Sequence, residues 1–365
     1  MEPPPLNASF VESTRIRAAW QGRVSGCLLG KPLEILSFKE GLPGLQNYLQ
    51  QVDSLPLRDY VPLIEGTVVE QTAVACCREN IVRAEPDDDI NYTVLALLLM
   101  EQHGLELDTA DVARAWLRQI PAGTTWTAER EAYRTLMNKM DSEFVNGAAP
   151  GFDIADCSDN EFNDWIGAQI RADLYGWICP GRPALAAKLA TKDASLSHRG
   201  EGVHGAAFIA ALGAAIPAIK DLDAAFDEAL RHIPAESKTA AAVRFGRQLE
   251  PGPDAVERLH QQFEDLSPVH TLNNLALVVW ALNSADGDFS AAIGNAVAAG
   301  WDTDCNGATV GGLFGLTGAP IPESWTKPWA GRIGVSLAGI DELSLDNVVE
   351  RTVAVAKNIA MQVSA

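Results

Sequence analysis

The chain has 365 residues and a formal net charge of −20 at pH 7; 47% of its residues are hydrophobic and 21% are charged. This apolar fraction excludes a disordered protein, and the negative charge repels phosphate backbones, which argues against nucleic-acid binding as the main activity. Alanine is abundant, aromatic residues are few and alternating β-branched runs are absent, so the composition predicts an all-α fold.

The cysteine pattern predicts a reducing compartment. No Cys-x-x-Cys pair or zinc-ribbon spacing is present, so we expect buried reduced thiols in a cytoplasmic protein. The start, Met1 to Pro5, lacks the basic and apolar regions of a signal peptide, and no stretch has the apolar length of a membrane helix. We therefore expect neither nucleic acid nor membrane as a partner. The cysteines are Cys27, Cys76, Cys77, Cys157, Cys179 and Cys305.

The first predicted elements are a flexible tail over residues 1–12 and a helix over 13–29. We expect Gly30-Lys31-Pro32 to end this helix, directly before Glu34. Several prolines, glycines and aspartates predict a loop over 42–62. Neither an internal repeat nor a long biased linker divides the remainder, so residues 13–365 are predicted to form one domain.

The strongest helix signal runs from residue 86 to residue 103, because Pro86 and the acids that follow it suit a first helical turn. The segment 306–316 is rich in glycine, and we interpret it as a buried helix that allows close helix approach. Apolar periodicity predicts further helices over 108–119, 127–139, 164–175, 183–190, 203–218, 224–231, 239–248, 255–263, 274–282 and 290–299.

Two acidic clusters lie far apart in the sequence: one covers residues 87–89, and the other is Asp302-Thr303-Asp304. Hard cations such as Mg²⁺ prefer oxygen ligands, and two clusters that meet in space would supply enough of them for a pair of ions. The first cluster also suits an ordinary helix cap. Asp302 and Asp304 lie between an alanine-rich and a glycine-rich apolar segment, and buried carboxylates need partners, which favours a functional site.

Four stretches resemble the ADP-ribosylglycohydrolase family, in the family's order. Residues 22–34 are similar to its glycine-rich helix with a Gly-x-Pro-x-Glu turn, and residues 87–97 stand in place of its Thr-Asp-Asp-Thr metal segment. Residues 195–198 match a central Ser–His segment, and residues 300–308 resemble the Asp-Thr-Asp metal signature.

The resemblance implies an all-α orthogonal helical bundle with a binuclear magnesium site, with Mn²⁺ as an alternative ion. It implies hydrolysis of an N- or O-ribosyl bond, with an ADP-ribosylated protein or a small-molecule ribosyl compound as substrate. The metal ligands that it implies are Asp87, which stands where the family often has threonine, together with Asp88, Asp89, Asp302 and Asp304.

The resemblance also implies a catalytic role for Glu34 and Asp304. Bound metal would orient the ribose and lower the pKa of a water, and Glu34 would guide that water or protonate the leaving group. Three positions depart from the family: Cys27 replaces an aspartate, and Ile90 and Cys305 each replace a threonine. A thiol is a poor magnesium ligand, so these departures bear on the substrate and the second metal more than on the fold.

Six residues are candidates for substrate binding, although histidines and aromatic residues more often belong to the core. Two other interpretations stay open: a hydrolase of a free nucleoside or another metabolite N-glycoside, and a non-catalytic relative that binds ADP-ribose. Phosphate-binding loops, nucleophile elbows and zinc-protease helices are absent from the sequence. The six candidates are Tyr92, Ser197, His198, Gly200, Trp301 and Asn306.

Overall fold

The computed structural model describes residues 12–252 and 254–364, so the predicted tail lies outside the described residues except for residue 12. The all-α prediction is confirmed: helices dominate, and the described residues hold one short two-stranded sheet. Within these ranges no helix combines the length and the apolar character needed to cross a membrane.

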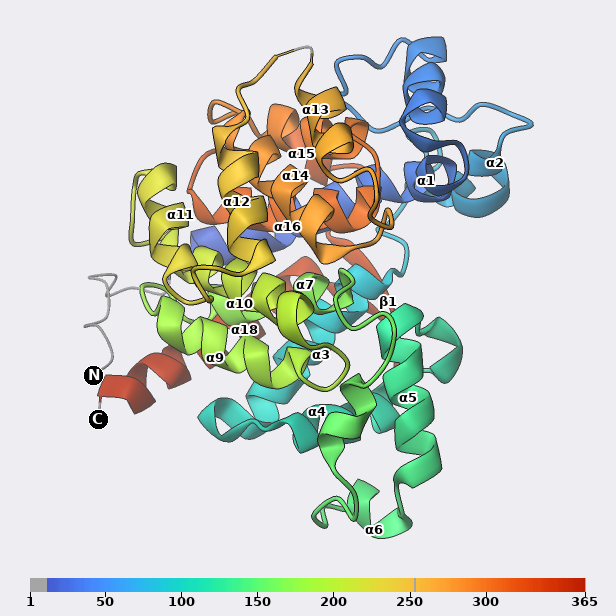
Figure 1. The fold of residues 1–365 in the computed structure, drawn as a ribbon. Coiled ribbons are helices and arrows are strands. Elements are labelled where there is room, and N and C mark those ends of the chain that lie inside the picture. Colours follow the sequence, from blue (N-terminus) through green and yellow to red (C-terminus); the bar gives the residue numbers. More distant parts are fainter. Residues whose placement is uncertain (1–11, 253, 365) are drawn as a thin grey trace.

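The centre of the molecule is an antiparallel pair of helices, α1 (Ser13–Gln51) and α16 (Thr303–Leu316), shown in blue and orange in Figure 1. Glycines let the two backbones touch: a Cβ on Gly22 would lie 2.0 Å from the carbonyl oxygen of Gly311, and one on Gly26 would lie 1.9 Å from that of Gly307. Every residue of α16 is buried, so the prediction of a glycine-rich core helix over 306–316 is confirmed.

The other helices surround this pair. Helix α15 (Phe289–Ala298) and helix α14 (Thr271–Asn283) pack on α16, and α12 (Lys238–Gln248) packs on α14. On another side, α10 (Gly200–Ala215) packs against α7 (Gly167–Ile170), α8 (Asp173–Trp177) and α9 (Pro183–Ala194) (Figure 1).

The remaining elements complete the bundle. The hairpin of β1 and β2 pairs Arg332 with Ser344 and leads directly into the last helix. These elements are α2 (Val68–Ala73), α3 (Asp88–His103), α4 (Thr109–Gln119), α5 (Thr127–Lys139), α6 (Ser142–Val145), α11 (Leu222–Leu230), α13 (Ala255–Gln262), α17 (Glu323–Thr326), β1 (Arg332–Leu337), β2 (Ile340–Ser344), α18 (Leu345–Ser364) and the 3₁₀ turns Val74–Cys76, Gly104–Glu106, Ala122–Thr124 and Ile154–Ser158.

Three predicted segments differ from the structure. The first helix does not end at Gly30-Lys31-Pro32; it continues to Gln51, with its break at Gly41, where φ is 64°. The predicted loop over 42–62 is therefore helical up to residue 51. The helix predicted over 164–175 is two short helices, α7 and α8. Helices α2, α6, α17 and α18 and the β-hairpin were not predicted.

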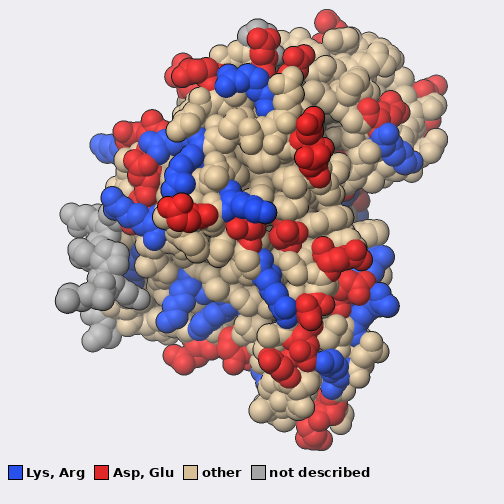
Figure 2. All heavy atoms as spheres, in the orientation of Figure 1, with Lys and Arg blue, Asp and Glu red and all other residues tan. Residues whose placement is uncertain are grey.

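The surface carries charge of both signs. On the face drawn in Figure 2, Asp and Glu side chains alternate with Lys and Arg, and no continuous basic surface is seen there.

Candidate functional site

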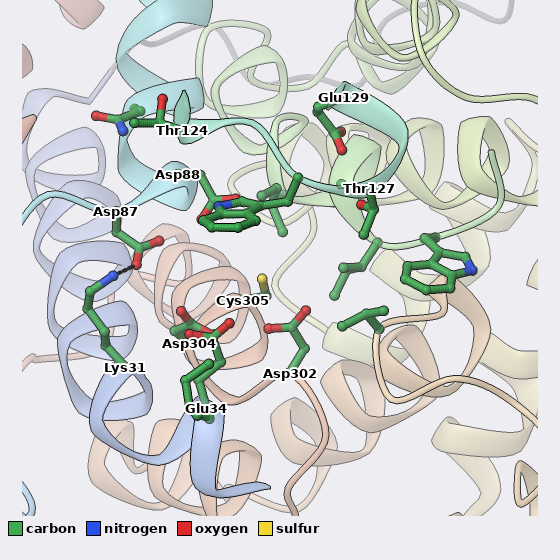
Figure 3. A pocket seen from close by; sticks show the side chains of 18 of the residues that line it. Lys31, Glu34, Asp87, Asp88, Thr124, Thr127, Glu129, Asp302, Asp304 and Cys305 are labelled. Carbon is green, nitrogen blue, oxygen red and sulfur yellow. Dashed lines mark hydrogen bonds and ion pairs between the residues drawn. The ribbon is translucent and has the colours of Figure 1, made fainter. Parts of the chain in front are cut away.

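A cavity of about 480 Å³ opens where the middle of α1 meets the first turns of α3 and α16. Five of the predicted site carboxylates line it (Figure 3). They come from three segments that are distant in sequence: Glu34 from α1, Asp87 and Asp88 from the start of α3, and Asp302 and Asp304 from the start of α16.

The glycine contacts of α1 and α16 set the position of Glu34. A Cβ on Gly30 would lie 2.2 Å from the carbonyl oxygen of Thr303, and the Thr303 hydroxyl donates a 2.8 Å hydrogen bond to the Gly30 carbonyl. Glu34 lies one helical turn beyond Gly30, so it faces the beginning of α16, where Asp302 and Asp304 stand.

The chain enters α16 through a tight turn with positive φ angles, 85° at Gly300 and 57° at Trp301. A bulky residue in this region is uncommon and costs roughly 1–3 kcal/mol, which the surrounding contacts must offset. One such contact is the Asp302 amide, which donates a 3.3 Å hydrogen bond to the Asn274 side-chain oxygen. The strained turn therefore fixes the direction of the Asp302 side chain.

The three aspartates at the start of α3 have different partners. Asp87 is the N-cap residue and accepts a 3.0 Å hydrogen bond from the Asp89 amide, and it also forms an ion pair with Lys31. Asp88 lines the cavity. Asp89 is fully buried and points to Arg23, whose Nη2 lies 3.2 Å from Asp89 Oδ1 and whose Nη1 lies 2.9 Å from Asp173 Oδ2.

Potential metal-ligand atoms gather in three overlapping groups, each with its atoms within 4.8 Å of one another. Asp89 Oδ2, Asp302 Oδ1 and Asp304 Oδ1 are buried and have no hydrogen-bond partner within the described chain. Such orphaned carboxylate oxygens fit a divalent cation, because an unpaired buried charge is costly. The groups are Glu34 with Asp302 and Asp304; Asp89 with Asp304 and Cys305; and Cys27 with Asp87 and Asp89.

The electrostatics of the cluster favour a cation. Burial, followed by the charge of Asp304, raises the pKa of Glu34 and of Asp302 well above the usual range. Burial and Asp87 raise the pKa of Asp304 to about 6 and that of Asp88 well above its usual value. Because a bound cation stabilises the ionised carboxylates, it would lower these pKa values again.

Lys31 partly neutralises the cluster from one side. Burial alone would raise the pKa of Asp87, but the Lys31 ammonium group holds it below its ordinary value. Burial alone would lower the pKa of Lys31, and Asp87 reverses this, so its pKa lies well above the usual range. Asp87 is therefore an ionised carboxylate with a fixed partner, unlike the orphaned oxygens of Asp302 and Asp304.

The opposite wall of the cavity comes from the α4–α5 loop and the first turn of α5. Thr124, Thr127 and Glu129 lie across from Glu34 and Asp304 in Figure 3, and Trp126 lines the same cavity. Thr127 has φ of 37°, a left-handed value that is strained for a β-branched residue. The loop thus holds an unfavourable backbone conformation at the cavity.

The six predicted substrate-binding residues lie outside this lining among the described residues. Tyr92 packs 5.6 Å from the Trp116 ring, and Trp301 stacks 4.3 Å from His260 and lines a separate cavity of about 450 Å³. Their role in substrate binding stays a prediction.

The other four of these residues are held by contacts elsewhere or are exposed. Asn306 donates a 2.8 Å hydrogen bond to Asn274. Ser197 Oγ lies 2.8 Å from His198 Nδ1, and both residues are buried. Gly200 is exposed at the start of α10.

The two cysteines that replace family residues lie at the cluster. Cys305 lines the cavity, and Cys27 is buried beside Asp87 and Asp89. Burial raises the pKa of both thiols well above the usual value, so both are protonated and weak ligands for a hard cation.

The sequence interpretation missed three charged residues. Arg23 and Lys31 lie on a helix face where the sequence shows only isolated basic residues, and the ion pairs with Asp89 and Asp87 depend on tertiary packing. Glu129 has the pattern of an ordinary acidic residue in a first helical turn. Its role in the lining depends on Arg171, which donates a 2.5 Å hydrogen bond to it.

Comparison with known proteins agrees with this geometry. A model of the ADP-ribosylglycohydrolase family matches residues 10–356, so the chain belongs to that family, and this membership indicates a glycosidase-type hydrolase. A solved structure titled "ADP-ribosylglycohydrolase-related protein complex" is 20% identical, with a TM-score of 0.53 over 95% of this chain and 98% of that chain. This likeness shows a shared fold. No curated protein matches the sequence.

Proposed function

We propose that the protein is a magnesium-dependent hydrolase that cleaves an N- or O-ribosyl glycosidic bond, with two metal ions held at the carboxylate cluster and Mn²⁺ as an alternative. The observation that carries this proposal is the convergence of Glu34, Asp302 and Asp304, within 4.8 Å of one another, in the main cavity of an ADP-ribosylglycohydrolase-family chain.

The metal ligands in this proposal are Asp88, Asp302 and Asp304, with Asp89 and Asp87 behind them. The orphaned oxygens of Asp89, Asp302 and Asp304 support this assignment. A bound divalent ion would supply Lewis-acid stabilisation and a water of lowered pKa. Asp87 would act mainly through Lys31, because that ion pair already occupies one of its oxygens.

Glu34 is the proposed proton carrier. Before metal binds, burial and the charge of Asp304 raise its pKa well above the usual range, which favours the protonated form of this carboxyl group. In the reaction, the oxygen of water bonds to the anomeric carbon while the bond to the leaving nitrogen or oxygen breaks. The leaving group takes one proton of that water, and Glu34 would transfer this proton.

The test is product release from ribosyl compounds, followed by mass spectrometry. The panel holds ADP-ribosyl-arginine, ADP-ribosyl-serine, O-acetyl-ADP-ribose, adenosine and other N-nucleosides, each with Mg²⁺ and with chelator. We expect at least one ribosyl bond to be cleaved only when Mg²⁺ or Mn²⁺ is present. Saturable Mg²⁺ binding without cleavage of any compound would instead favour a non-catalytic binding protein.

A further inference from the structure

The potential metal-ligand groups of the cluster differ in chemistry. Glu34, Asp302 and Asp304 form an oxygen-only group, whereas Asp89, Asp304 and Cys305 form a mixed group of two carboxylates and a thiol. In each group the ligand atoms lie within 4.8 Å of one another, which is close to twice a metal–ligand bond of about 2.0–2.3 Å. Asp304 belongs to both groups, so the two positions are neighbours in the cluster.

The mixed group contains two of the orphaned carboxylate oxygens. Asp89 and Asp304 are buried, and Asp89 Oδ2 and Asp304 Oδ1 have no hydrogen-bond partner within the described chain. Arg23 holds the other oxygen of Asp89, because its Nη2 lies 3.2 Å from Asp89 Oδ1 and also donates a 2.9 Å hydrogen bond to the Asp89 carbonyl oxygen. The guanidinium thus fixes the orientation of this carboxylate and leaves Oδ2 to an ion.

The main cavity gives access to the mixed group. Asp304 and Cys305 both line it, and Figure 3 shows the sulfur of Cys305 at the carboxylate cluster. Asp89 does not belong to the described lining, whereas all three residues of the oxygen-only group do. The mixed group is therefore the deeper of the two positions, and an ion can enter it from the cavity.

A second thiol, Cys27, also lies beside Asp89, in a group with Asp87. Both oxygens of Asp87 are already engaged: Oδ1 accepts a 3.0 Å hydrogen bond from the Asp89 amide, and Oδ2 forms the ion pair with Lys31. Cys27 also lies outside the described lining of the cavity. Of the two thiols, Cys305 is therefore the one with accessible and unengaged carboxylate neighbours.

A thiol beside carboxylates changes which ions bind best. Mg²⁺ demands near-octahedral oxygen ligands and usually retains several waters. Zn²⁺ accepts sulfur as well as oxygen, commonly with four ligands, and thiolate ligands favour it over Mg²⁺. As the metal–sulfur bond forms, the thiol releases its proton to solvent, so that the ligand is a thiolate.

We propose that the two positions prefer different cations: the mixed group of Asp89, Asp304 and Cys305 binds a thiophilic divalent cation such as Zn²⁺ in preference to Mg²⁺, and the oxygen-only group keeps Mg²⁺ or Mn²⁺. This inference rests on the proposed function, because it divides the same cluster between two kinds of ion. Cys305 is the residue that sets the preference of the deeper position.

Charge transfer from thiolate to metal tests this preference without turnover. Co²⁺, which replaces Zn²⁺ as a coloured probe, is titrated into the full chain with excess Mg²⁺ and a non-thiol reductant while ultraviolet absorption is recorded. We expect a charge-transfer band that saturates at one Co²⁺ per chain, that further Mg²⁺ leaves in place and that Zn²⁺ removes. Saturable Co²⁺ binding without the band, loss of the band on addition of Mg²⁺, or no Co²⁺ binding in excess Mg²⁺ would overturn the proposal.

Variants identify the thiol. Cys305→Ser should abolish the band and weaken Zn²⁺ binding at least about tenfold, whereas Mn²⁺ binding, measured by electron paramagnetic resonance, should change less than about threefold. The retained Mn²⁺ binding also shows that the variant is folded. Cys179→Ser is the matched control, because Cys179 is an equally buried thiol outside these ligand groups, and it should keep the band. A band that Cys27→Ser abolishes and Cys305→Ser retains would contradict the assignment to Cys305.

The two proposals can fail separately. A thiolate band that depends on Cys305, without cleavage of any ribosyl compound in Mg²⁺, would uphold the thiophilic position and contradict the hydrolase function. Mg²⁺-dependent cleavage by a protein that binds Co²⁺ without the band would uphold the hydrolase and overturn the division of the cluster between two kinds of ion.

Discussion

Asp304 combines three properties that are rarely found in one side chain. It is buried, one of its oxygens has no partner in the described chain, and burial together with Asp87 raises its pKa to about 6. In the absence of metal, the folded protein must either protonate this carboxyl group or keep an unpaired charge. This cost to stability is the expected consequence of a site built to hold a cation.

Asp304→Asn should therefore stabilise the metal-free protein while it removes activity. The pKa of Asp304 in the folded protein lies above the ordinary value of 3.8, so the Asp304 contribution to stability is present below pH 4 and is lost as the pH rises through about 6. In chelator at pH 7.5 we expect the variant to unfold at higher denaturant concentration than the wild type, with the gap closing towards pH 4. In Mg²⁺ its kcat/KM should fall at least about 100-fold.

The matched control for this variant is Asp341→Asn, because Asp341 is an exposed carboxylate on β2, far from the cluster in sequence. It should change neither stability nor turnover. Wild-type turnover by Asp304→Asn would refute the assignment of Asp304 to the site.

Arg23 stabilises the buried side of the site, because its guanidinium compensates the negative charge of two buried carboxylates, Asp89 and Asp173. Arg23→Met should cost about 3–5 kcal/mol of stability, since both carboxylates would lose their guanidinium partner. Arg17→Met is the control on the same helix: Arg17 pairs with the exposed Asp346, and its loss should cost no more than about 1 kcal/mol. Chemical denaturation measures both, and equal losses would contradict this role of Arg23.

At the scale of elements, the site depends on how closely α1 approaches α16. Glycine in a helix costs roughly 1 kcal/mol relative to alanine, and this pair of helices uses glycines at Gly22, Gly26, Gly307 and Gly311. The cost is offset by backbone contact along the buried pair. That contact also sets the distance between Glu34 and the aspartates of α16.

Gly26→Ala tests this link between packing and site. Its Cβ would lie 1.9 Å from the Gly307 carbonyl oxygen, so the helices must separate, and overpacking of this kind costs about 1–3 kcal/mol. We also expect Mg²⁺ affinity to fall at least roughly tenfold, as ligands on the two helices move apart. Gly252→Ala is the control, because nothing lies within 4 Å of the added Cβ. Unchanged Mg²⁺ affinity in Gly26→Ala would contradict the proposed coupling.

The elements that could be predicted from the sequence are those whose signals are local. Helix α3 follows from Pro86 and its acids, and α16 follows from small residues in an apolar segment. The continuation of α1 past Pro32 could not be predicted, because the tertiary burial of Leu33, Leu36 and Leu45 compensates for the lost hydrogen bond. Helix α18 does carry a local signal, because Val348, Thr352 and Val355 form a buried face at helical spacing, although valine and threonine have lower helix propensity.

In the candidate site, too, only the residues with a local sequence signal could be predicted. The acidic motifs predicted that residues near 88 and 302–304 would be important, and the structure brings them to one cavity with Glu34. The cavity wall with Trp126 and Glu129 could not be predicted, because these residues come to the cavity only through the α4–α5 loop and the contact of Glu129 with Arg171. Sequence motifs therefore predicted the carboxylates but not the opposite wall of the cavity.

At the scale of the whole molecule, metal binding should raise the free energy of unfolding. The cluster joins segments from the beginning, the first third and the end of the chain, so a cation held there ties the fold together. Mg²⁺ at 100 times its dissociation constant should add about 2.7 kcal/mol of stability. A thermal melt should show a higher melting temperature in Mg²⁺ than in chelator at equal ionic strength, and Asp304→Asn should lose most of this difference. Equal shifts in both proteins would mean that the ion acts elsewhere.

The proposed function depends above all on the binding of divalent cations by this carboxylate cluster. Anomalous diffraction from crystals soaked in Mn²⁺ tests it directly, because the manganese signal locates the ion without assumptions about activity. We expect a peak at roughly 2.2 Å from oxygens of Asp302 and Asp304, with Asp88 or Glu34 beside it. A map without a peak at the cluster, at a Mn²⁺ concentration that stabilises the protein in solution, would contradict it.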